Sequence, residues 1–371
     1  GLFGQFCALI KAYYTQKYGA NSAQLRDCSD GYHFVPSVAA ETFSKMIALS
    51  GPGKIEVLTL RQFVSQPKYV EKQGKKVVSI RNFNRETSKE EYYKGQIFID
   101  ATYEGDLAAA AGVPYKLGRE GADEYGEQCA GKIYRWWKHG PDDKGTTYQG
   151  DNAIQAYNYR LCLTNNPDNR IDISRPEKYN RDEYISLIDD VLDGRNTDSR
   201  FRIIDEIKMA ENRKRILAGE RTSTPGDVWG IGKLTSITRL PNAKTDANNQ
   251  HLALISTDLP EENWPWPTSE WEWRDRYAKR LRDYTLGLLW FAQNDESLPV
   301  HFRQACGQWG LAADEYLDNG GFPRQVYVRE GRRLEGLYFF TAHDALPLSE
   351  GARPPLHNTS ITASHYALDS H

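Results

Sequence analysis

The spacing of hydrophobic and polar residues predicts two helices and a strand at the start of the chain. Across Leu2–Tyr18, apolar side chains recur at steps of three and four residues, and the following Gly19 is a typical helix end. A second helix is expected across Pro36–Gly51, because proline is favoured in a first turn and apolar residues again share one face. The alternation across Ile55–Leu60 predicts a strand.

Two further strand patterns follow. Gln66–Val70 and Val77–Phe83 lie on either side of Gly74 and are typical of a hairpin. Gln96–Asp100 then predicts a short apolar strand, which leads through a polar turn into the alanine-rich helix Leu107–Ala111. Ligands of open α/β sheets bind beyond the carboxyl ends of strands. The turn after Asp100 is therefore the first candidate site.

Beyond about residue 115 the sequence is richer in charged and turn-forming residues. Three helices are expected there: Arg181–Leu192, Phe201–Leu217 and Trp271–Asn294. The last carries a stripe that is typical of a core, made of Trp273, Tyr277, Leu281, Tyr284 and Leu288. The tryptophan-rich segment 264–273 is interpreted either as a loop pinned to the core or as a platform that stacks on sugar rings.

Composition excludes some classes of protein. The 371 residues include 47 basic and 50 acidic side chains, for a net charge of -3, which argues against a nucleic-acid-binding protein. No apolar run approaches the roughly 20 residues of a membrane-spanning helix. The chain starts at Gly1 rather than Met, so we expect a true N-terminus to be missing, and the compartment is not predicted.

The cysteines and histidines do not predict a metal site. Five cysteines and eight histidines are scattered, without the short spacings that zinc ligands show. Buried or unpaired thiols are expected, and a single bridge such as Cys7–Cys28 stays open.

Spacing alone does not predict a nucleotide-binding protein. A dinucleotide-binding fold normally shows a strand, the motif GxGxxG and a helix whose N-terminus holds the pyrophosphate. The segment Gly51-Pro52-Gly53 precedes a strand instead, and Gly1-Leu2-Phe3-Gly4 has a different spacing.

Five stretches, in order along the chain, nevertheless resemble a bacterial family of FAD-dependent oxidoreductases, some members of which carry the label xanthan lyase. The clearest is Phe98-Ile99-Asp100-Ala101-Thr102-Tyr103-Glu104-Gly105-Asp106-Leu107 with its continuation to residue 120. The others are residues 155–164, 240–249, 318–333 and 368–371. At Gly331 the family tends to carry Ala, which we expect to matter little.

The resemblance implies an α/β fold of the two-dinucleotide-fold flavoprotein type, with an incomplete FAD domain like that of glutathione reductase. Residues 1–115 would form part of the FAD-binding domain without its first βα unit. Residues 116–320 would form a mixed α+β substrate or cap region, and residues 321–371 would return toward the FAD domain. The family's glycine fingerprint precedes the position of Gly1, and its closing segment follows that of His371. We therefore expect a fragment; the alternative is a remnant that has lost its cofactor.

The resemblance also implies the cofactor, FAD, and residues that contact it. Ala101 and Thr102 correspond to the segment beside the flavin, and Leu60 and Arg61 to the end of the strand that passes the adenine. Glu104 and Asp106 lie close to a helix start, so a role in helix capping is open beside a role at the cofactor or substrate.

Catalytic and substrate-binding residues are expected toward the end of the chain and in two polar segments. Arg329, Arg332 and Arg333 would stabilise the anionic reduced flavin or hold a substrate, with Tyr327 or His343 as proton acceptor. A structural network with Glu330 and Glu335 is the alternative reading of the arginines. The substrate-binding candidates are Asn158, Arg160, Asp246 and Asn249; polar residues of this kind also simply form turns.

The function implied by the resemblance is FAD-dependent hydride transfer from an organic substrate, with a carbohydrate as one candidate. Two alternatives stay open: a polysaccharide lyase, and a cofactor-less carbohydrate-binding protein on the same scaffold. The expected partner is a small molecule or carbohydrate, and neither the substrate nor the oligomeric state follows from the sequence.

Overall fold

The computed structural model describes residues 1–128, 130–134, 142–194, 206–221, 228–251, 253–347, 349 and 351–360. Cys129, the stretch 368–371 and the first residues of the helix expected from Phe201 lie outside the described residues. The chain forms two compact units, each built from three separate stretches. Unit 1 comprises Gly1–Leu58, Tyr157–Leu259 and Arg276–Tyr327; unit 2 comprises Thr59–Ala156, Pro260–Asp275 and Val328–His371.

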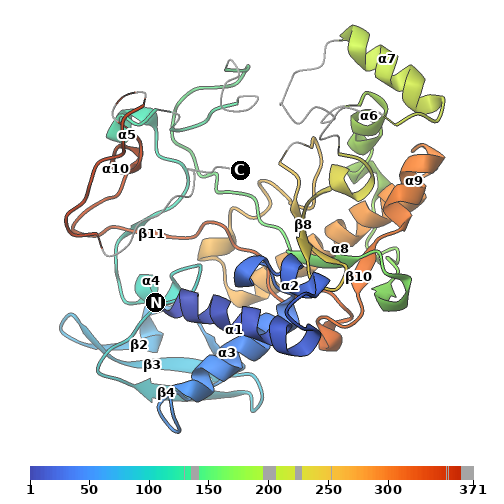
Figure 1. The fold of residues 1–371 in the computed structure, drawn as a ribbon. Helices are drawn as coiled ribbons and strands as arrows, with labels where there is room; N and C mark the ends of the chain where they lie inside the picture. The colour runs from blue at the N-terminus through green and yellow to red at the C-terminus, as the bar shows by residue number, and fades with distance from the viewer. Residues whose placement is uncertain are drawn as a thin grey trace. The chain divides into compact units, whose positions relative to one another are not determined.

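Unit 1 begins with the two predicted helices, which are confirmed. The first, α1 (Leu2–Tyr18), ends at Gly19, whose left-handed φ of 93° lets its N–H reach the Thr15 carbonyl at 2.9 Å. The short α2 (Ala23–Asp27) follows, and α3 (Pro36–Leu49) starts with its proline in the first turn, where no N–H is needed. These three helices lie together at the blue end of the ribbon (Figure 1).

A five-stranded antiparallel sheet forms the centre of unit 1. Its strands stand in the order β7 (Arg170–Ile171), β10 (Gly310–Ala312), β6 (Leu161–Thr164), β9 (Lys244–Asn249) and β8 (Thr235–Leu240). One buried cluster joins α1 and the start of α3 to this sheet; it includes Ile10, Tyr14, Val38, Cys162, Leu240 and Ala312. The sheet is therefore held from the helical side by apolar burial, the main favourable contribution to folding.

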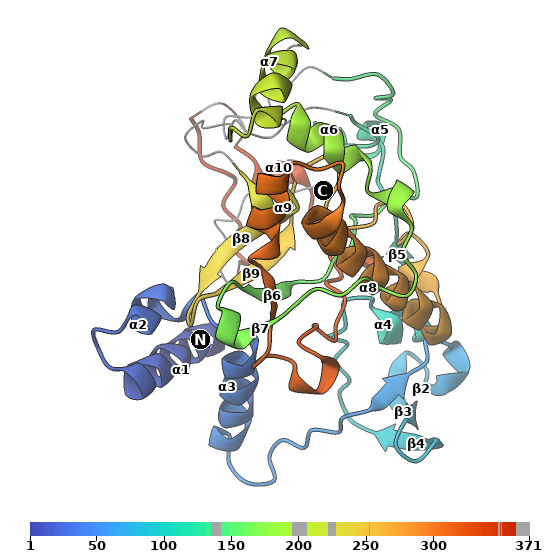
Figure 2. The ribbon, with the colours of Figure 1, turned by 90° about the vertical axis from the view of Figure 1, so that its right-hand side faces the viewer.

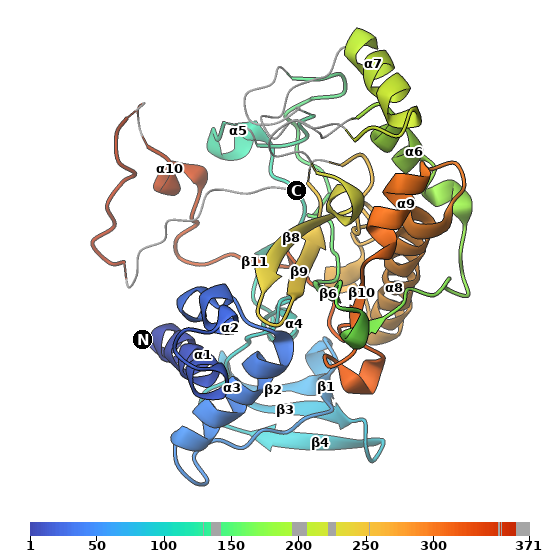
Figure 3. The same ribbon diagram turned by 45° about the vertical axis from the view of Figure 1, so that its right-hand side comes forward.

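Four more helices belong to unit 1 in whole or in part: α6 (Ser186–Leu192), α7 (Glu206–Leu217), α8 (Trp271–Asn294) and α9 (Val300–Gly307). The bounds predicted for α8 are confirmed. Four members of its predicted core stripe, Tyr277, Leu281, Tyr284 and Leu288, are buried, and the fifth, Trp273, is partly buried. Helices α8 and α9 lie on the side of the sheet away from α1 (Figures 2 and 3).

A buried ion pair ties β9 of unit 1 to the start of α3. The Lys244 Nζ lies 2.6 Å from Glu315 Oε1, and both side chains are 1% exposed. Burial lowers the pKa of Lys244, but hydrogen bonds to Asp314 and Glu315 outweigh it and raise the pKa overall. The other oxygen of Glu315 accepts the Ser37 N–H at 2.8 Å. A charged lysine is therefore kept inside the unit because it is paired.

Unit 2 contains a second antiparallel sheet, built around the long strand β3 (Lys76–Asn84). One edge of β3 pairs with β4 (Lys89–Lys94). The other edge pairs first with β2 (Val70–Gln73) and then with β1 (Arg61–Phe63). The hairpin predicted around Gly74 is confirmed, with its first strand shifted toward the turn. These strands lie together in Figure 1.

Two predicted strands are absent from the described structure. Ile55–Leu60 forms a loop and turn, and β1 begins only at Arg61. Gln96–Asp100 is also extended without strand pairing, and Ile97 and Ile99 are each 82% exposed. Both predictions were wrong for the same reason: alternating apolar residues form a strand only beside a neighbour that completes the hydrogen-bond ladder. Among the described residues neither segment has one.

The remainder of unit 2 is made of short elements. These are α4 (Asp106–Ala110), β5 (Tyr115–Lys116), α5 (Ala122–Tyr125), β11 (Arg333–Leu334) and α10 (Ala342–Ala345). The two-residue strands β5 and β11 pair antiparallel, with Arg333 opposite Lys116. This pairing brings the arginine-rich segment of the sequence beside the stretch that follows α4.

The buried thiols of the described residues are free, Cys7 and Cys28 among them. In the part of the chain that the structure describes, no helix combines the length and apolar character required to cross a membrane.

Candidate functional site

The turn at residues 100–106 in unit 2 is organised by Asp100. One carboxylate oxygen of Asp100 accepts the N–H of Thr102 at 3.0 Å and its hydroxyl at 2.7 Å, and the other accepts the Ala108 N–H at 2.9 Å. The Thr102 hydroxyl in turn accepts the Gly105 N–H at 3.0 Å. Gly105 adopts a left-handed φ of 69°, which suits glycine, and α4 begins at the next residue. Asp100 is thus the capping side chain of this turn, a role that the sequence suggested for its neighbours.

Asp106 is the centre of a buried ion cluster, which we call the Asp106 cluster: Asp106, Arg274 and Arg332. Arg274 lies 2.6 Å and 2.9 Å from the two carboxylate oxygens, in a bidentate arrangement. Arg332 Nη1 also donates to Oδ1, at 2.8 Å. The side chains are at most 4% exposed. Burial raises the pKa of Asp106, but the two guanidinium groups outweigh it and lower the pKa overall.

Glu104 is held by a tryptophan of the aromatic segment. Its Oε1 accepts the indole N–H of Trp266 at 2.9 Å, and both residues are buried. Trp271 similarly donates its indole N–H to the Phe63 carbonyl at 2.7 Å. For these two tryptophans the structure favours the loop pinned within unit 2. Neither Glu104 nor Asp106 caps α4 through its side chain.

Leu60 and Arg61, the residues predicted near the adenine, lie at the start of β1. Leu60 is 55% exposed and has a left-handed φ of 56°, which is uncommon for a leucine. The Arg61 guanidinium is bound to Glu86 at 2.6 Å and to Glu91 at 3.1 Å. Ala101 is exposed. The cofactor roles of these residues stay predictions.

The hydrogen-bonding groups of the turn at residues 100–106 do not fit the pyrophosphate of FAD. The Asp100 carboxylate, which is bound only by N–H and O–H groups of the turn, would repel a phosphate, whereas the charge of Asp106 is balanced by Arg274 and Arg332. The N–H groups of Thr102 and Ala108 are already bound to Asp100. Helix N-termini bind phosphate through open N–H groups. The described residues of this turn therefore offer FAD no phosphate cradle.

The three predicted catalytic arginines of unit 2 do not form one cluster. Arg332 belongs to the Asp106 cluster, and its Nε is a buried atom without a hydrogen-bond partner within the described structure. Arg333 pairs with Glu330 and with Glu120, the latter at 2.8 Å. Arg329 is partly buried. The contacts of Arg333 correspond to the structural network that the sequence left open, while a catalytic role stays a prediction.

In unit 1, by contrast, three of the four predicted substrate residues come together with Tyr327. Arg160 forms a bidentate ion pair with Asp246, through Nε at 3.0 Å and through Nη2. Its guanidinium carbon lies 5.2 Å from the centre of the Tyr327 ring. The Tyr327 N–H donates to the Asn158 carbonyl at 2.8 Å. We call these four residues the Arg160 cluster.

Asn158 and Asn249 make further hydrogen bonds in and around the Arg160 cluster. The Asn158 side chain is fully buried and donates to Asn248 Oδ1 at 2.9 Å. Asn249 is buried and lies 3.4 Å from Asp258. Hydrogen bonding to Asp246, and then to Tyr327, raises the pKa of Arg160 above its ordinary value although burial lowers it. The cluster therefore presents a charged guanidinium, balanced by Asp246, beside a phenol, with Arg160 42% exposed.

Sequence reasoning missed two residues of these sites, Asp100 and Arg274. The signal for Arg274 was its position one turn before Tyr277 and two turns before Leu281, on the core stripe of α8. An arginine at a core position requires a carboxylate partner. No group of three or more histidine, cysteine or carboxylate side chains suited to a metal occurs among the residues described.

One comparison with known proteins identifies the class of this protein. The model of the family described as FAD dependent oxidoreductase matches residues 1–371, the whole chain. The class is thus that of flavin-dependent oxidoreductases, enzymes that use FAD. The chain belongs to the FAD dependent oxidoreductase family. No curated protein and no solved structure gives a significant match to it.

Proposed function

We propose that this chain oxidises a hydroxyl-bearing organic substrate, of which carbohydrates are one class, with the Arg160 cluster as the part that holds the substrate. The observation that supports oxidation is the family match over residues 1–371. We further propose that the scaffold is the two-dinucleotide-fold type, with the division of roles at residues 115 and 320 that the resemblance implies. The compact units divide at other residues, and each is a structural unit rather than an assigned binding region.

The Arg160 cluster has the groups that binding and proton removal need. A half-exposed guanidinium can donate N–H groups to a substrate oxygen while Asp246 keeps its plane fixed. The Tyr327 phenol lies against that guanidinium, and phenols serve as proton-transfer groups in enzymes. In this proposal Arg160 orients the hydroxyl, and Tyr327 in its phenolate form takes the hydroxyl proton.

FAD, when bound, supplies the acceptor for the hydrogen and electron pair that leave the substrate carbon. Oxidation of an alcohol to a carbonyl also releases the hydroxyl proton, which must be taken by a base. The contribution of this chain is to place that base and to hold the oxygen. The resemblance also assigns Arg329, Arg332 and Arg333 a role in stabilising the negative charge of the reduced flavin, and that role stays a proposal.

The test is anaerobic mixing of the FAD-loaded protein with a panel of sugars and sugar alcohols, followed by the flavin absorbance near about 450 nm. A substrate that bleaches the flavin establishes oxidation. Tyr327→Phe should then slow bleaching by about 100-fold or more, because general-base catalysis contributes about 100- to 10,000-fold. The control is Tyr32→Phe, an exposed tyrosine beside Phe3. Equal rates in Tyr327→Phe and the wild type would remove Tyr327 from the mechanism.

A further inference from the structure

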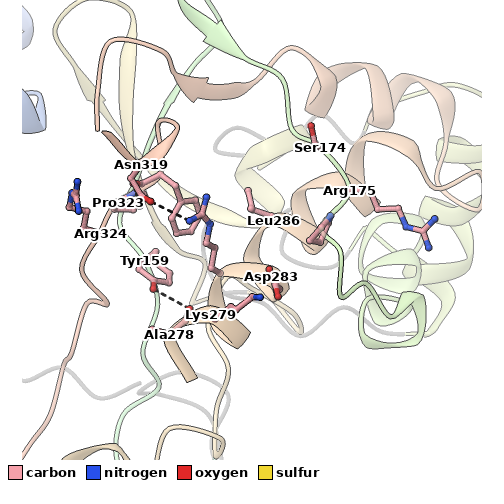
Figure 4. Close-up of a pocket in the computed structure, with 13 residues that line it drawn as sticks. Tyr159, Ser174, Arg175, Ala278, Lys279, Asp283, Leu286, Asn319, Pro323 and Arg324 are labelled. Carbon is pink, nitrogen blue, oxygen red and sulfur yellow. Dashed lines mark hydrogen bonds between the residues drawn. The ribbon is translucent and has the colours of Figure 1, made fainter. Parts of the chain in front are cut away.

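We propose that a cavity in unit 1 is a binding site for a small organic carboxylate that also carries hydroxyl groups. The cavity has a volume of about 560 Å³, within the range of small-molecule sites. One wall is the face of α8 from Ala278 to Leu286, and the others are Ser174–Pro176 and Asn319–Arg324 (Figure 4). The inference does not rest on the proposed oxidation, because it concerns binding alone.

Arg282 is the side chain that we expect to bind the carboxylate of the ligand. It lies on the cavity-facing side of α8 and is partly buried. Its Nη1 donates to Asn319 Oδ1 at a long 3.4 Å, and its guanidinium carbon is 4.8 Å from the centre of the Phe322 ring. No carboxylate of the described chain lies within ion-pair distance of it. Arg280, two residues earlier, is by contrast paired with Glu183 at 2.7 Å.

Two other arginines, Arg175 and Arg324, line the cavity. Arg175 stacks its guanidinium on Tyr179, at 4.7 Å from the ring centre, and points away from the other labelled side chains in Figure 4. Arg324 is exposed and paired with Asp318. Arg324 thus has a carboxylate partner, and Arg175 is held by ring stacking with its guanidinium turned away from the other labelled side chains. Both arginines add positive potential to the lining.

Lys279 is the second open cation. It is exposed, lies one turn before Arg282 and has no hydrogen bond or ion pair to any residue that the structure describes. Asp283 also lines the cavity and lies one turn after Lys279. Two open cations therefore face one carboxylate, so the lining favours a ligand with a single negative charge.

The floor of the cavity is rigid and apolar. Tyr159 and Phe322 are 4% and 1% exposed and meet edge to face, with ring centres 4.8 Å apart. The Tyr159 hydroxyl donates to the Ala278 carbonyl at 3.1 Å, which fixes the floor to α8. Asn319 donates its amide to the Phe322 carbonyl at 2.9 Å, so its oxygen is turned toward Arg282. The guanidinium is thus held in place before any ligand arrives.

This arrangement selects the ligand by its chemistry. The fork of Arg282 can hold a carboxylate through two N–H groups, with Lys279 as a second donor. The Asp283 carboxylate can accept hydrogen bonds from hydroxyl groups. It would repel the second charge of a phosphate. A hydroxylated carboxylate, such as a sugar acid, satisfies all three side chains.

The experiment is calorimetric titration of the full chain at low salt, without FAD, using D-glucuronate, D-glucose and inorganic phosphate as probes. Glucuronate should bind saturably and more tightly than phosphate, and glucose, which lacks the carboxylate, should bind at least about tenfold more weakly. Equal binding of glucuronate and glucose, preferential binding of phosphate, or no binding of glucuronate would each overturn the proposal. Oxidation assays are not involved, so failure here leaves the proposed function intact.

Substitutions in and near the cavity test whether glucuronate binds there. Arg282→Gln should weaken the binding of glucuronate by about tenfold or more, because a charge-assisted hydrogen bond is lost. Arg280→Gln is the matched control on the same helix, outside the cavity lining, and should leave the affinity within about twofold. Lys279→Gln, at an exposed position without described contacts, guards against misfolding and should also weaken binding. Unchanged affinity in both cavity variants would overturn the assignment.

Discussion

The Nη1 atom of Arg332 lies 2.8 Å from Oδ1 of Asp106, although 226 residues separate them in the chain. Arg274 holds the same carboxylate at 2.6 Å and 2.9 Å. A single buried carboxylate thus joins the turn after residue 100, the first turn of α8 and the segment beside β11. Unit 2 depends on this one residue more than on any exposed ion pair of the chain.

Asp106→Asn should destabilise unit 2 by about 3–5 kcal/mol, because removing one partner leaves buried guanidinium groups without their counter-charge. Equilibrium urea unfolding monitored by tryptophan fluorescence measures the change. The control is Asp318→Asn, which breaks the exposed pair with Arg324 and should change stability little. Equal effects of the two substitutions would show that the Asp106 cluster is not a stability centre.

Acid should remove the contribution of Asp106 to the stability of unit 2. The folded-state pKa of Asp106 is lowered, so its stabilising effect is fully present above the unfolded value of about 3.9 and is lost as the pH falls through the lower folded value. The stability difference between wild type and Asp106→Asn should therefore be constant at neutral pH and shrink below about pH 4. Urea unfolding of both proteins between about pH 7 and pH 3 measures this; a difference that grows in acid would contradict the lowered pKa.

Hydrophobic periodicity was sufficient to predict the long helices. In α1 and α8 the apolar stripe itself is what becomes buried, so local pattern and tertiary packing agree. The same reasoning failed for Ile55–Leu60 and for Ile97 and Ile99, where a strand depends on a neighbour rather than on the segment. Sequence distance also hid the Asp106 cluster, because nothing local to Asp106 indicates an arginine 168 residues later.

The sequence could not place the residues of the Arg160 cluster together either. Asn158, Arg160, Asp246 and Tyr327 were predicted separately, and β6 pairs with β9 so that Cys162 stands opposite Asp246 and Leu161 opposite Ala247. That register places Arg160 beside Asp246. Register is a property of the assembled sheet, and no single segment contains it.

Gly331→Ala should destabilise unit 2, although the resemblance suggested that this position matters little. A Cβ at Gly331 would lie 2.2 Å from the carbonyl oxygen of Tyr103, a backbone atom that cannot turn aside. Relief requires a backbone shift next to the Asp106 cluster, at a cost of about 1–3 kcal/mol. Gly336→Ala is the control, because its Cβ would meet the Tyr338 carbonyl at an ordinary 3.4 Å. Urea unfolding compares the two; equal stability would mean that the segment has room to move.

Arg160→Lys tests whether the Arg160 cluster recognises substrate through the shape of the guanidinium as well as its charge. Lysine keeps the charge but cannot pair with Asp246 through two N–H groups while offering others to a substrate. We expect kcat/KM for flavin reduction to fall by about 10- to 100-fold, which corresponds to about 1.4–2.7 kcal/mol of lost transition-state stabilisation.

The matched control for Arg160→Lys is Arg213→Lys in α7. Arg213 also holds an aspartate, Asp193, through Nε and Nη2, and its side chain is 43% exposed against 42% for Arg160. Because Arg213 also contacts Asp189 at 2.9 Å, Arg213→Lys should lower the unfolding midpoint at least as much as Arg160→Lys, whereas only Arg160→Lys should reduce the rate. A fall of the same size in both variants would assign the loss to stability and leave the Arg160 cluster a structural ion pair.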